Sequence, residues 1–170
     1  NYYFCEMNAR IQVEHPVTET VCGIDLVAWQ LKIASGEALS FDQKDIVPRG
    51  HAMECRINAE DAEHDFRPCP GTIHGMHTPG GPGVRVDSAA YQGYSIPPYY
   101  DSMISKLIVS GGDRPETLRR MRRALAEMLF EGVTTNTDFL MEILNTKEFE
   151  EGNYTTDFIE EYLRHRRREG

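Results

Sequence analysis

The stretch EMNARIQVEHPVTE, residues 6–19, carries side chains of the kinds that bind ions and move protons. Its alternate residues are acids, amides and a cation, namely Glu6, Asn8, Arg10, Gln12 and Glu14. Carboxylate and carboxamide oxygens coordinate hard cations, a guanidinium grips an oxyanion through paired hydrogen bonds, and a carboxylate can accept a proton. These side-chain types therefore fit a site for a cation and an anion.

The alternation also predicts how this segment is built. An extended chain sends alternate side chains to opposite faces, so residues 6–14 are expected to form a strand or ribbon with one polar face. The other face is mostly apolar, with Met7, Ala9, Ile11, Val13 and His15. A half-buried antiparallel strand shows the same alternation merely because one side is wet. The pattern alone fits a functional face and an ordinary strand equally well.

A second stretch, HAMECRINAED at residues 51–61, repeats the alternation. One face would hold Glu54, Arg56, Asn58 and Glu60, and the other Met53, Cys55, Ile57 and Ala59. If the two strands lay side by side, Arg56 would neutralise carboxylates of the first strand or an anion that both strands share. Two such faces in one short chain favour a functional site.

The composition excludes several classes of protein. With 170 residues the chain matches one domain, or one domain and a fragment. There is no long apolar run, so no membrane span is expected, and a net charge of -9 argues against a nucleic-acid binder. The basic run at residues 164–169 fits the end of a terminal helix.

The cysteines and the opening residues bear on the cellular setting. Four cysteines fall in no C-x-x-C spacing and are expected to be reduced thiols of a cytoplasmic protein. They are Cys5, Cys22, Cys55 and Cys69, of which Cys5 and Cys55 would lie on apolar strand faces. The start has neither an initiator Met nor a signal peptide and opens on a strand-like segment, so we expect the chain to be part of something larger.

Local signals divide the first third of the chain into helices and a boundary. Pro16 can open one helix, Gly23 can end it, and Asp25 can cap a second helix that Gly36 ends. The polar, turn-rich stretch that follows, up to Gly50, is the best candidate for a boundary between residues 1–48 and 49–170.

The remaining residues favour an α+β fold. Residues 66–110 are expected to be β structure, with a strand from about 103 to 110 and a possible Asp101–Lys106 ion pair. The glycines at 79–83 do not form a phosphate loop, because prolines interleave them and no helix follows. Helices are expected from Asp113 to Gly132, at 136–145 and at 156–168. Helices, then strands, then helices argue against an alternating α/β fold.

Five longer motifs, in order along the chain, resemble those of the biotin carboxylases, the ATP-dependent subunits or domains of acetyl-CoA carboxylase and its relatives. They are EMNARIQVEHPVTE, GHAMECRINAED, PGGPGVRVDS, PPYYDSMISKL and FEGVTTNTDFL. The resemblance implies the end of an ATP-grasp domain over residues 1–48, followed by a biotin carboxylase C-terminal domain of antiparallel strands with flanking helices. With Pro16, the motif VEHPVTE is more similar to that of acetyl-, propionyl- or methylcrotonyl-CoA carboxylases than to that of pyruvate carboxylases.

The resemblance also implies a reaction. In this family, bicarbonate attacks the γ-phosphoryl group of ATP, bound with Mg²⁺ or Mn²⁺, to give carboxyphosphate. Carbon dioxide released from carboxyphosphate is captured by biotin, which a carrier protein holds. In acetyl-CoA carboxylase, an enzyme of fatty acid synthesis, this is the first half-reaction. The matching positions would be Glu6 and Asn8 for the metal, Arg10, Gln12 and the N–H of Val13 for bicarbonate, and Glu14 as the catalytic base.

Further roles follow from the same resemblance. Arg56 would be catalytic, binding biotin and stabilising its enolate-like oxyanion, while Glu54 and Asn58 hold Arg56 in place. Arg85 would lie at or near the contact of a homodimer. A biotin carboxyl carrier protein and carboxyltransferase subunits would be partners, and the acyl-CoA acceptor would be chosen by the carboxyltransferase.

Two other classes stay open. Another ATP-grasp ligase, such as a carbamoyl-phosphate synthetase segment, shares a Glu-x-Asn-x-Arg strand, but GHAMECRINAED and PPYYDSMISKL argue against it. The second is a non-catalytic dimerisation module, because this region contributes much of the homodimer contact in the family. The sequence contains no nucleotide loop and no biotinyl-lysine motif, so the fragment alone is expected to be inactive.

Overall fold

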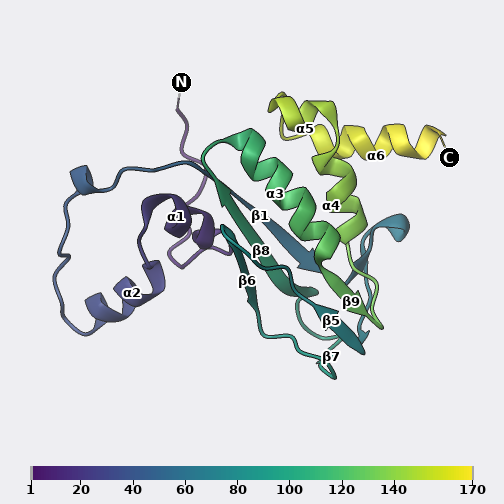
Figure 1. The fold of residues 1–170 in the computed structure, drawn as a ribbon, viewed down its shortest axis with the longest axis horizontal. Coiled ribbons are helices and arrows are strands. Elements are labelled where there is room, and N and C mark those ends of the chain that lie inside the picture. The colour runs from purple at the N-terminus through teal and green to yellow at the C-terminus, as the bar shows by residue number, and fades with distance from the viewer. Residues whose placement is uncertain (1, 170) are drawn as a thin grey trace.

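The computed structural model describes residues 2–169, and side chains as far as residue 166. At its centre is a three-stranded antiparallel sheet in the order β1-β8-β6 (Figure 1). These strands are β1 (His51–Asn58), β8 (Met103–Gly111) and β6 (Val84–Ser88). The strands predicted near residues 51–61 and 103–110 are therefore confirmed.

One face of this sheet carries the hydrophobic core. Helix α3 (Arg114–Glu127) packs on β8 and β1 and lies across the sheet in Figure 1. It begins where predicted, because the Asp113 carboxylate accepts a hydrogen bond from the Glu116 N–H at 2.8 Å. The fully buried side chains at the centre of the core include Ile57, Leu107, Val109, Leu118, Met121 and Leu125.

The glycines at 79–83 have a structural task at the start of β6. Gly83 has a φ of 71°, in the left-handed region. A Cβ added there would lie 2.7 Å from the Ser110 carbonyl oxygen. Glycine is therefore required by the close approach of this turn to β8.

Short strand pairs extend the sheet region, as predicted for residues 66–110. All three pairs are antiparallel. They are β2 (Glu60–Asp61) with β3 (Arg67–Pro68), β4 (Gly71–Thr72) with β7 (Ser95–Ile96), and β5 (Gly75–His77) with β9 (Leu129–Glu131). Strand β9 corrects the prediction of a helix up to Gly132. Met128 is already extended, and pairing with β5 overrides the helical pattern of the sequence.

The helices predicted at 136–145 and 156–168 are confirmed, and a short helix that was not predicted lies between them. Beyond β9 come α4 (Thr137–Leu144), α5 (Lys147–Glu151) and α6 (Phe158–Glu169). In Figure 1, α4 lies alongside α3, and α5 and α6 follow at the upper right. Two short 3-10 turns, Gln43–Asp45 and Ala62–His64, complete the elements. Among the described residues, no helix is both long and apolar enough to cross a membrane.

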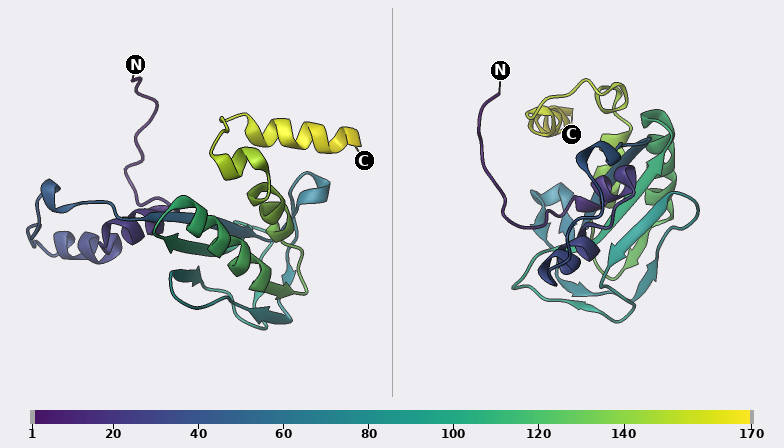
Figure 2. Two further views of the ribbon diagram at one scale, coloured as in Figure 1. Left: turned by 45° about the horizontal axis from the view of Figure 1, so that its top comes forward. Right: turned by 90° about the vertical axis from the view of Figure 1, so that its left-hand side faces the viewer.

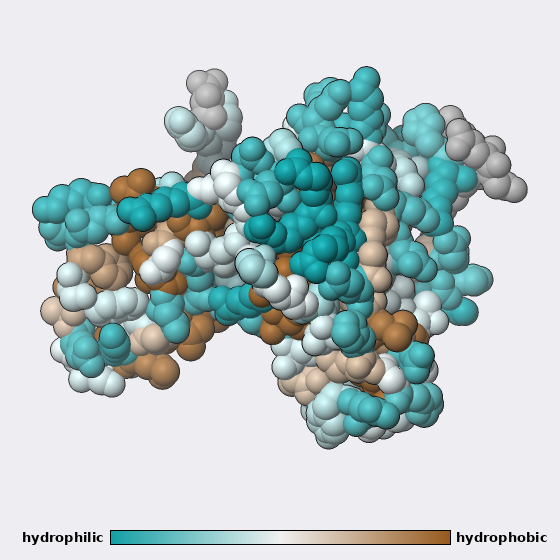
Figure 3. All heavy atoms as spheres, viewed as in Figure 1, coloured by the Kyte–Doolittle hydropathy of each residue, from teal (hydrophilic) through white to brown (hydrophobic). Residues whose placement is uncertain are grey.

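One N-terminal helix covers the other face of the sheet, and a second extends beyond the sheet. Helix α1 (His15–Cys22) contacts β1 and β8, and Gly23 ends it at a φ of 68°. Asp25 caps α2 (Leu26–Ala34) by accepting from the Ala28 N–H at 2.7 Å, as predicted. Residues 24–48, here called the arm, project from the sheet in Figure 2, and apolar side chains gather on this side of the molecule in Figure 3.

The opening segment corrects the first prediction. Residues 2–14 contain no strand, and the side chains of residues 2–10 are all exposed, including that of Cys5. A strand needs a partner for its backbone hydrogen bonds, and no strand among the described residues pairs with this segment. The predicted neighbour of β1 is therefore replaced by α1, while Cys55 on β1 is buried as predicted.

Candidate active site

Two residues from the two predicted polar faces meet although their segments do not pair as strands. The Arg56 Nη2 atom donates to the Glu14 Oε2 atom at 2.9 Å. Glu14 is fixed at the start of α1, where its carbonyl accepts from the Val17 N–H at 3.0 Å. Both side chains remain about half exposed, so the ion pair is open to a ligand.

Glu54 lies on the other side of Arg56. One carboxylate oxygen is 3.8 Å from the Arg56 Nε atom, and the other is buried with no hydrogen-bond partner among the described residues. Burial raises the pKa of Glu54, and the nearby cations Lys106 and Arg56 oppose that rise. This contact is the one that the predicted support of Arg56 by Glu54 requires, and the supporting role itself stays a prediction.

The raised pKa of Glu54 gives a testable effect on stability. When the pKa of an acid is higher in the folded state than in the unfolded state, the protein loses stability as pH rises through the folded-state pKa. Glutamine does not titrate, so the variant lacks this loss. We therefore expect Glu54→Gln to gain stability relative to the parent as pH rises from about 4 to about 7. Urea unfolding at both pH values measures this difference. Glu37→Gln, at an exposed site on the arm, should show no such trend, and a gain for Glu54→Gln that shrinks with rising pH would contradict the assignment.

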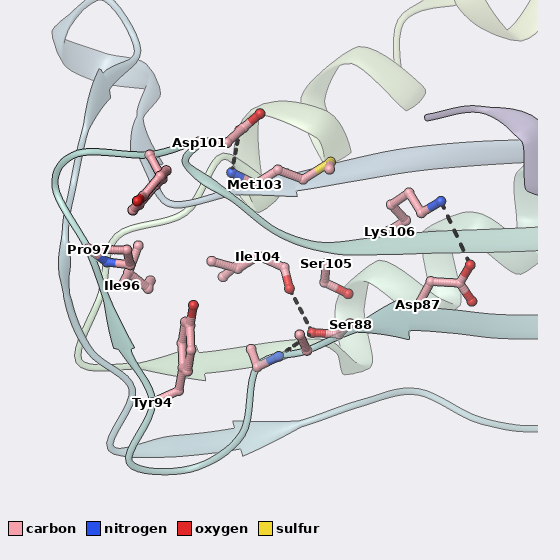
Figure 4. A pocket seen from close by; sticks show the side chains of 13 residues that line it. Asp87, Ser88, Tyr94, Ile96, Pro97, Asp101, Met103, Ile104, Ser105 and Lys106 are labelled. Carbon is pink, nitrogen blue, oxygen red and sulfur yellow. Dashed lines mark hydrogen bonds and ion pairs between the residues drawn. The ribbon is translucent and has the colours of Figure 1, made fainter. Parts of the chain in front are cut away.

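A row of charges crosses the sheet on the face under α1. Arg56 lies opposite Lys106, and Lys106 lies opposite Asp87 on β6. The Lys106 Nζ atom is 3.8 Å from the Asp87 carboxylate, the contact drawn in Figure 4, and donates to the Val13 carbonyl at 2.9 Å. The predicted Asp101–Lys106 pair is wrong. Asp101 instead accepts from the Met103 N–H at 2.8 Å, because it lies in the turn before β8.

Arg85 joins this row to the helices. Its guanidinium donates twice to Asp87, at 2.8 Å each, and once to Glu19 of α1 at 2.7 Å. The hydrogen bonds from Arg85 lower the pKa of Asp87. Glu19 is buried and also accepts from the Leu26 N–H at 2.8 Å, so it links α1, α2 and β6. No sequence pattern indicated Glu19, because one acid on a short helix is ordinary.

Asn136 replaces Asn58 as the residue that supports Arg56. The predicted role of Asn58 is wrong, since its amide donates to Glu60 at 3.3 Å. Buried Asn136 donates to the Arg56 carbonyl at 3.1 Å and accepts from the Asn58 N–H at 2.9 Å. This side chain pins the β1 backbone at Arg56. The motif TTNTDFL contained the residue, but no pattern in the sequence indicated its partner.

The other predicted residues lie along the exposed opening segment. The Asn8 amide donates to the Glu6 carboxylate at 3.0 Å, so these two oxygen-bearing side chains are together. The Arg10 guanidinium donates to the adjacent Ile11 carbonyl at 3.1 Å. The Gln12 carbonyl accepts from the His15 N–H at 3.2 Å, and its side chain is partly buried. The oxygens of Glu6 and Asn8 are of the kind that Mg²⁺ binds.

Arg10 and Arg56 do not share a cavity. Arg10 lines a largely apolar cavity between the opening segment and the arm. Arg56 lines a second cavity with Glu54, Asn58 and Asn136, over β1. Glu14 lines both, so the base predicted from the sequence lies where the two cavities meet.

Comparison with known proteins places this arrangement in a family. Residues 54–161 match the family described as the biotin carboxylase C-terminal domain, and residues 1–42 match the ATP-binding domain of the carbamoyl-phosphate synthase L chain. The chain belongs to the biotin carboxylase family. Its fold is that of the end of an ATP-grasp domain followed by a biotin carboxylase C-terminal domain, as predicted.

Individual biotin carboxylase relatives agree. The chain is 56% identical over 160 residues to a biotin carboxylase of Nostoc sp., covering 94% of this chain and 36% of the relative. It is 57% identical over 164 residues to a pyruvate carboxylase subunit of Methanothermobacter thermautotrophicus, covering 96% and 33%. The chain therefore spans about a third of the length of the curated relatives that it matches.

A solved biotin carboxylase structure has the same fold. The biotin carboxylase domain dimer of Hydrogenobacter thermophilus 2-oxoglutarate carboxylase matches with a TM-score of 0.94 and 49% identity, over 96% of this chain and 36% of the solved chain. That structure is a complex with MgADP, ADP and bicarbonate. Relatives named for pyruvate and for 2-oxoglutarate thus match closely too, so the family does not identify the final acceptor of the carboxyl group.

Proposed function

We propose that these residues form the bicarbonate and biotin half of a biotin carboxylase active site. The reaction is ATP-dependent carboxylation of carrier-bound biotin by bicarbonate, through carboxyphosphate. The observation that carries the proposal is the 2.9 Å contact between Glu14 and Arg56, which joins a candidate base to a candidate oxyanion-binding group at an open site. Membership of the biotin carboxylase family supports it. The nucleotide would be held by residues outside this segment.

Bicarbonate would be bound by the opening segment next to the base. Arg10 would grip two bicarbonate oxygens, and the Gln12 amide and Val13 N–H would complete its hydrogen bonds. Glu14 would take the bicarbonate proton, which leaves an oxygen free to attack the γ-phosphoryl group of ATP. Arg10 is exposed, and the one hydrogen bond from its guanidinium to the described residues goes to the neighbouring Ile11 carbonyl, so donors remain for a ligand.

A divalent cation would be bound by Glu6 and Asn8. The donor set fits Mg²⁺ or Mn²⁺, because both residues offer oxygen ligands and their side chains already touch. When bound with ATP, the cation neutralises charge on the phosphates. ATP phosphates would supply further ligands.

Arg56 would act on biotin. A guanidinium keeps its charge at working pH, so it can stabilise the oxyanion that forms when the ureido nitrogen of biotin loses its proton. Glu54 would hold the Arg56 side chain in place through its contact with the guanidinium. Asn136 would hold the Arg56 main chain by donating to the Arg56 carbonyl. The enolate oxygen of biotin would compete with Glu14 for the Arg56 guanidinium. Both side chains of the Glu14–Arg56 ion pair are about half exposed, so biotin can reach the guanidinium.

The partners are proposed on the same basis. A biotin carboxyl carrier protein would deliver biotin, and carboxyltransferase subunits would use the product. We propose acetyl-CoA carboxylase and fatty acid synthesis as the setting, with propionyl- or methylcrotonyl-CoA carboxylase as the alternative, on the similarity around Pro16. The solved relative that is a domain dimer supports a homodimer.

The test uses the full-length protein that carries this segment. ATP cleavage should depend on bicarbonate and rise further with free biotin, and labelled bicarbonate should be transferred to biotin. A protein that cleaves ATP with bicarbonate and ammonia but ignores biotin would instead be a carbamoyl-phosphate synthetase. A full-length protein that dimerises without any bicarbonate-dependent cleavage would be a dimerisation module.

Arg85 provides a test of the homodimer. If Arg85 faces acidic groups of a second copy, Arg85→Glu should weaken the dimer roughly 10-fold or more through like-charge repulsion. Sedimentation of the full-length protein measures this change. Because Arg85 also holds Glu19 and Asp87 of its own chain, Glu19→Gln is the matched control. An unchanged dimer in Arg85→Glu contradicts the contact, and equal weakening in both variants assigns the effect to α1.

A further inference from the structure

Lys106 is a mostly enclosed cation at the centre of the sheet whose task the reaction scheme above does not explain. It lies on the middle strand β8, and its side chain is only 13% exposed. In Figure 4 its ammonium group reaches from β8 toward Asp87 on β6. An ammonium withdrawn from water costs free energy unless it is paired and hydrogen-bonded, so its contacts matter.

The strand register makes a lysine at this position costly. Lys106 lies directly opposite Arg56, and like charges that face each other across two strands destabilise the pair. Carboxylates offset this repulsion from several sides, namely Asp87, Glu54 and Glu14. If only the stability of the fold mattered, an apolar residue at this position would avoid both the desolvation cost and the repulsion from Arg56. The ammonium is therefore explained best by what it binds.

Its closest described contact is with the chain beside the candidate base. The Lys106 Nζ atom donates to the Val13 carbonyl at 2.9 Å, across 93 residues of sequence. That carbonyl belongs to the peptide that joins Val13 to Glu14. Residues 2–14 form no strand, so no strand pairing holds this part of the main chain. The Lys106 bond holds the main chain at Val13, and the Arg56 bond holds the side chain of the next residue, Glu14. The two cations thus fix backbone and side chain of one short segment.

We propose that Lys106 is a positioning residue of the carboxylation reaction. It holds the Val13–Glu14 peptide against the sheet, so that the Val13 N–H and the Glu14 carboxylate keep their places around bicarbonate. The inference rests on the proposed function. A cation suits this task because a charge-assisted hydrogen bond to a carbonyl is stronger than a neutral one.

Lys106→Met in the full-length protein tests this role, because methionine keeps most of the apolar stem and removes the donor. We expect kcat/KM for bicarbonate to fall roughly 10- to 100-fold, the range for losing one hydrogen bond to a charged group. The KM for ATP should stay within about twofold, since Lys106 acts on the bicarbonate segment. A merely structural role would lower the amount of active enzyme and leave both KM values unchanged.

Two further variants sharpen the test. Lys106→Arg retains the charge and a donor, so it should recover most of the loss in kcat/KM for bicarbonate. It also keeps the charge pairing of the sheet if Lys106→Met fails to fold. Lys147→Met removes an exposed lysine of α5 and should behave as the parent.

The outcomes separate the inference from the proposed function. A selective loss toward bicarbonate in Lys106→Met, with recovery in Lys106→Arg, supports the positioning role. Equal changes toward bicarbonate and ATP in either variant overturn it. A parent enzyme that shows no ATP cleavage dependent on bicarbonate and biotin overturns the proposed function itself, and the inference with it.

Discussion

Glu14→Gln in the full-length protein is expected to lower bicarbonate-dependent ATP cleavage roughly 10²-fold or more. The amide has nearly the shape of the carboxylate and can still accept a hydrogen bond from Arg56, but it cannot take the bicarbonate proton. ATP binding should stay nearly intact, because Glu14 is assigned to bicarbonate. Steady-state ATP cleavage with and without bicarbonate, together with nucleotide titration, measures both quantities.

The control for this variant removes a carboxylate elsewhere. Glu37→Gln makes the same chemical change at an exposed residue of the arm and should turn over as the parent does. Near-normal turnover of Glu14→Gln would refute the assignment of the base. Equal loss of nucleotide binding and turnover would indicate that the site had collapsed.

Arg56→Gln is expected to lower biotin carboxylation roughly 10²- to 10³-fold, the effect of removing one oxyanion-binding donor. Arg56→Lys should recover only part of it, because lysine keeps the charge but lacks the planar fork of donors. Arg56→Gln also removes the ion pair with Glu14, but cleavage of ATP without biotin should fall less than carboxylation of biotin, because Arg56 is assigned to biotin. Transfer of labelled bicarbonate to biotin, measured beside ATP cleavage, separates the two steps.

Arg164→Gln is the matched control for Arg56. It removes an exposed guanidinium from α6, 4.0 Å from Glu160, and should leave both reactions unchanged. If Arg56→Gln impaired ATP cleavage and biotin carboxylation by the same factor, Arg56 would support Glu14 rather than biotin.

The parts of the fold that local chemistry decides could be predicted from the sequence. Gly23 and Asp25 separate α1 from α2, and Asp113 caps α3, because capping depends on residues within a few positions. The alternation of Cys55 and Arg56 on β1 was equally visible, since strand faces follow a period of two.

The parts that depend on distant partners could not be predicted. Residues 6–14 have the pattern of a strand, but a pattern does not supply the neighbour that a strand needs. Strand β9 forms only because β5 pairs with it. The Lys106–Val13 bond joins residues 93 positions apart, so no window of sequence contains both partners. The Glu14–Arg56 contact is an exception. The two alternating polar stretches predict that Arg56 pairs with carboxylates of the first stretch, and the family resemblance assigns both residues to one active site.

The arm has a consequence for spectroscopy. Trp29, the one tryptophan of the sequence, lies on α2. Its ring packs edge-on against that of Phe41, with the ring centroids 5.1 Å apart, and the Lys32 ammonium lies 4.6 Å from the Trp29 ring centroid. Intrinsic tryptophan fluorescence therefore reports on the arm, while far-ultraviolet circular dichroism also senses the sheet and α3. Unfolding curves from the two probes that fail to coincide would indicate an arm that melts separately, rather than an intermediate of the sheet.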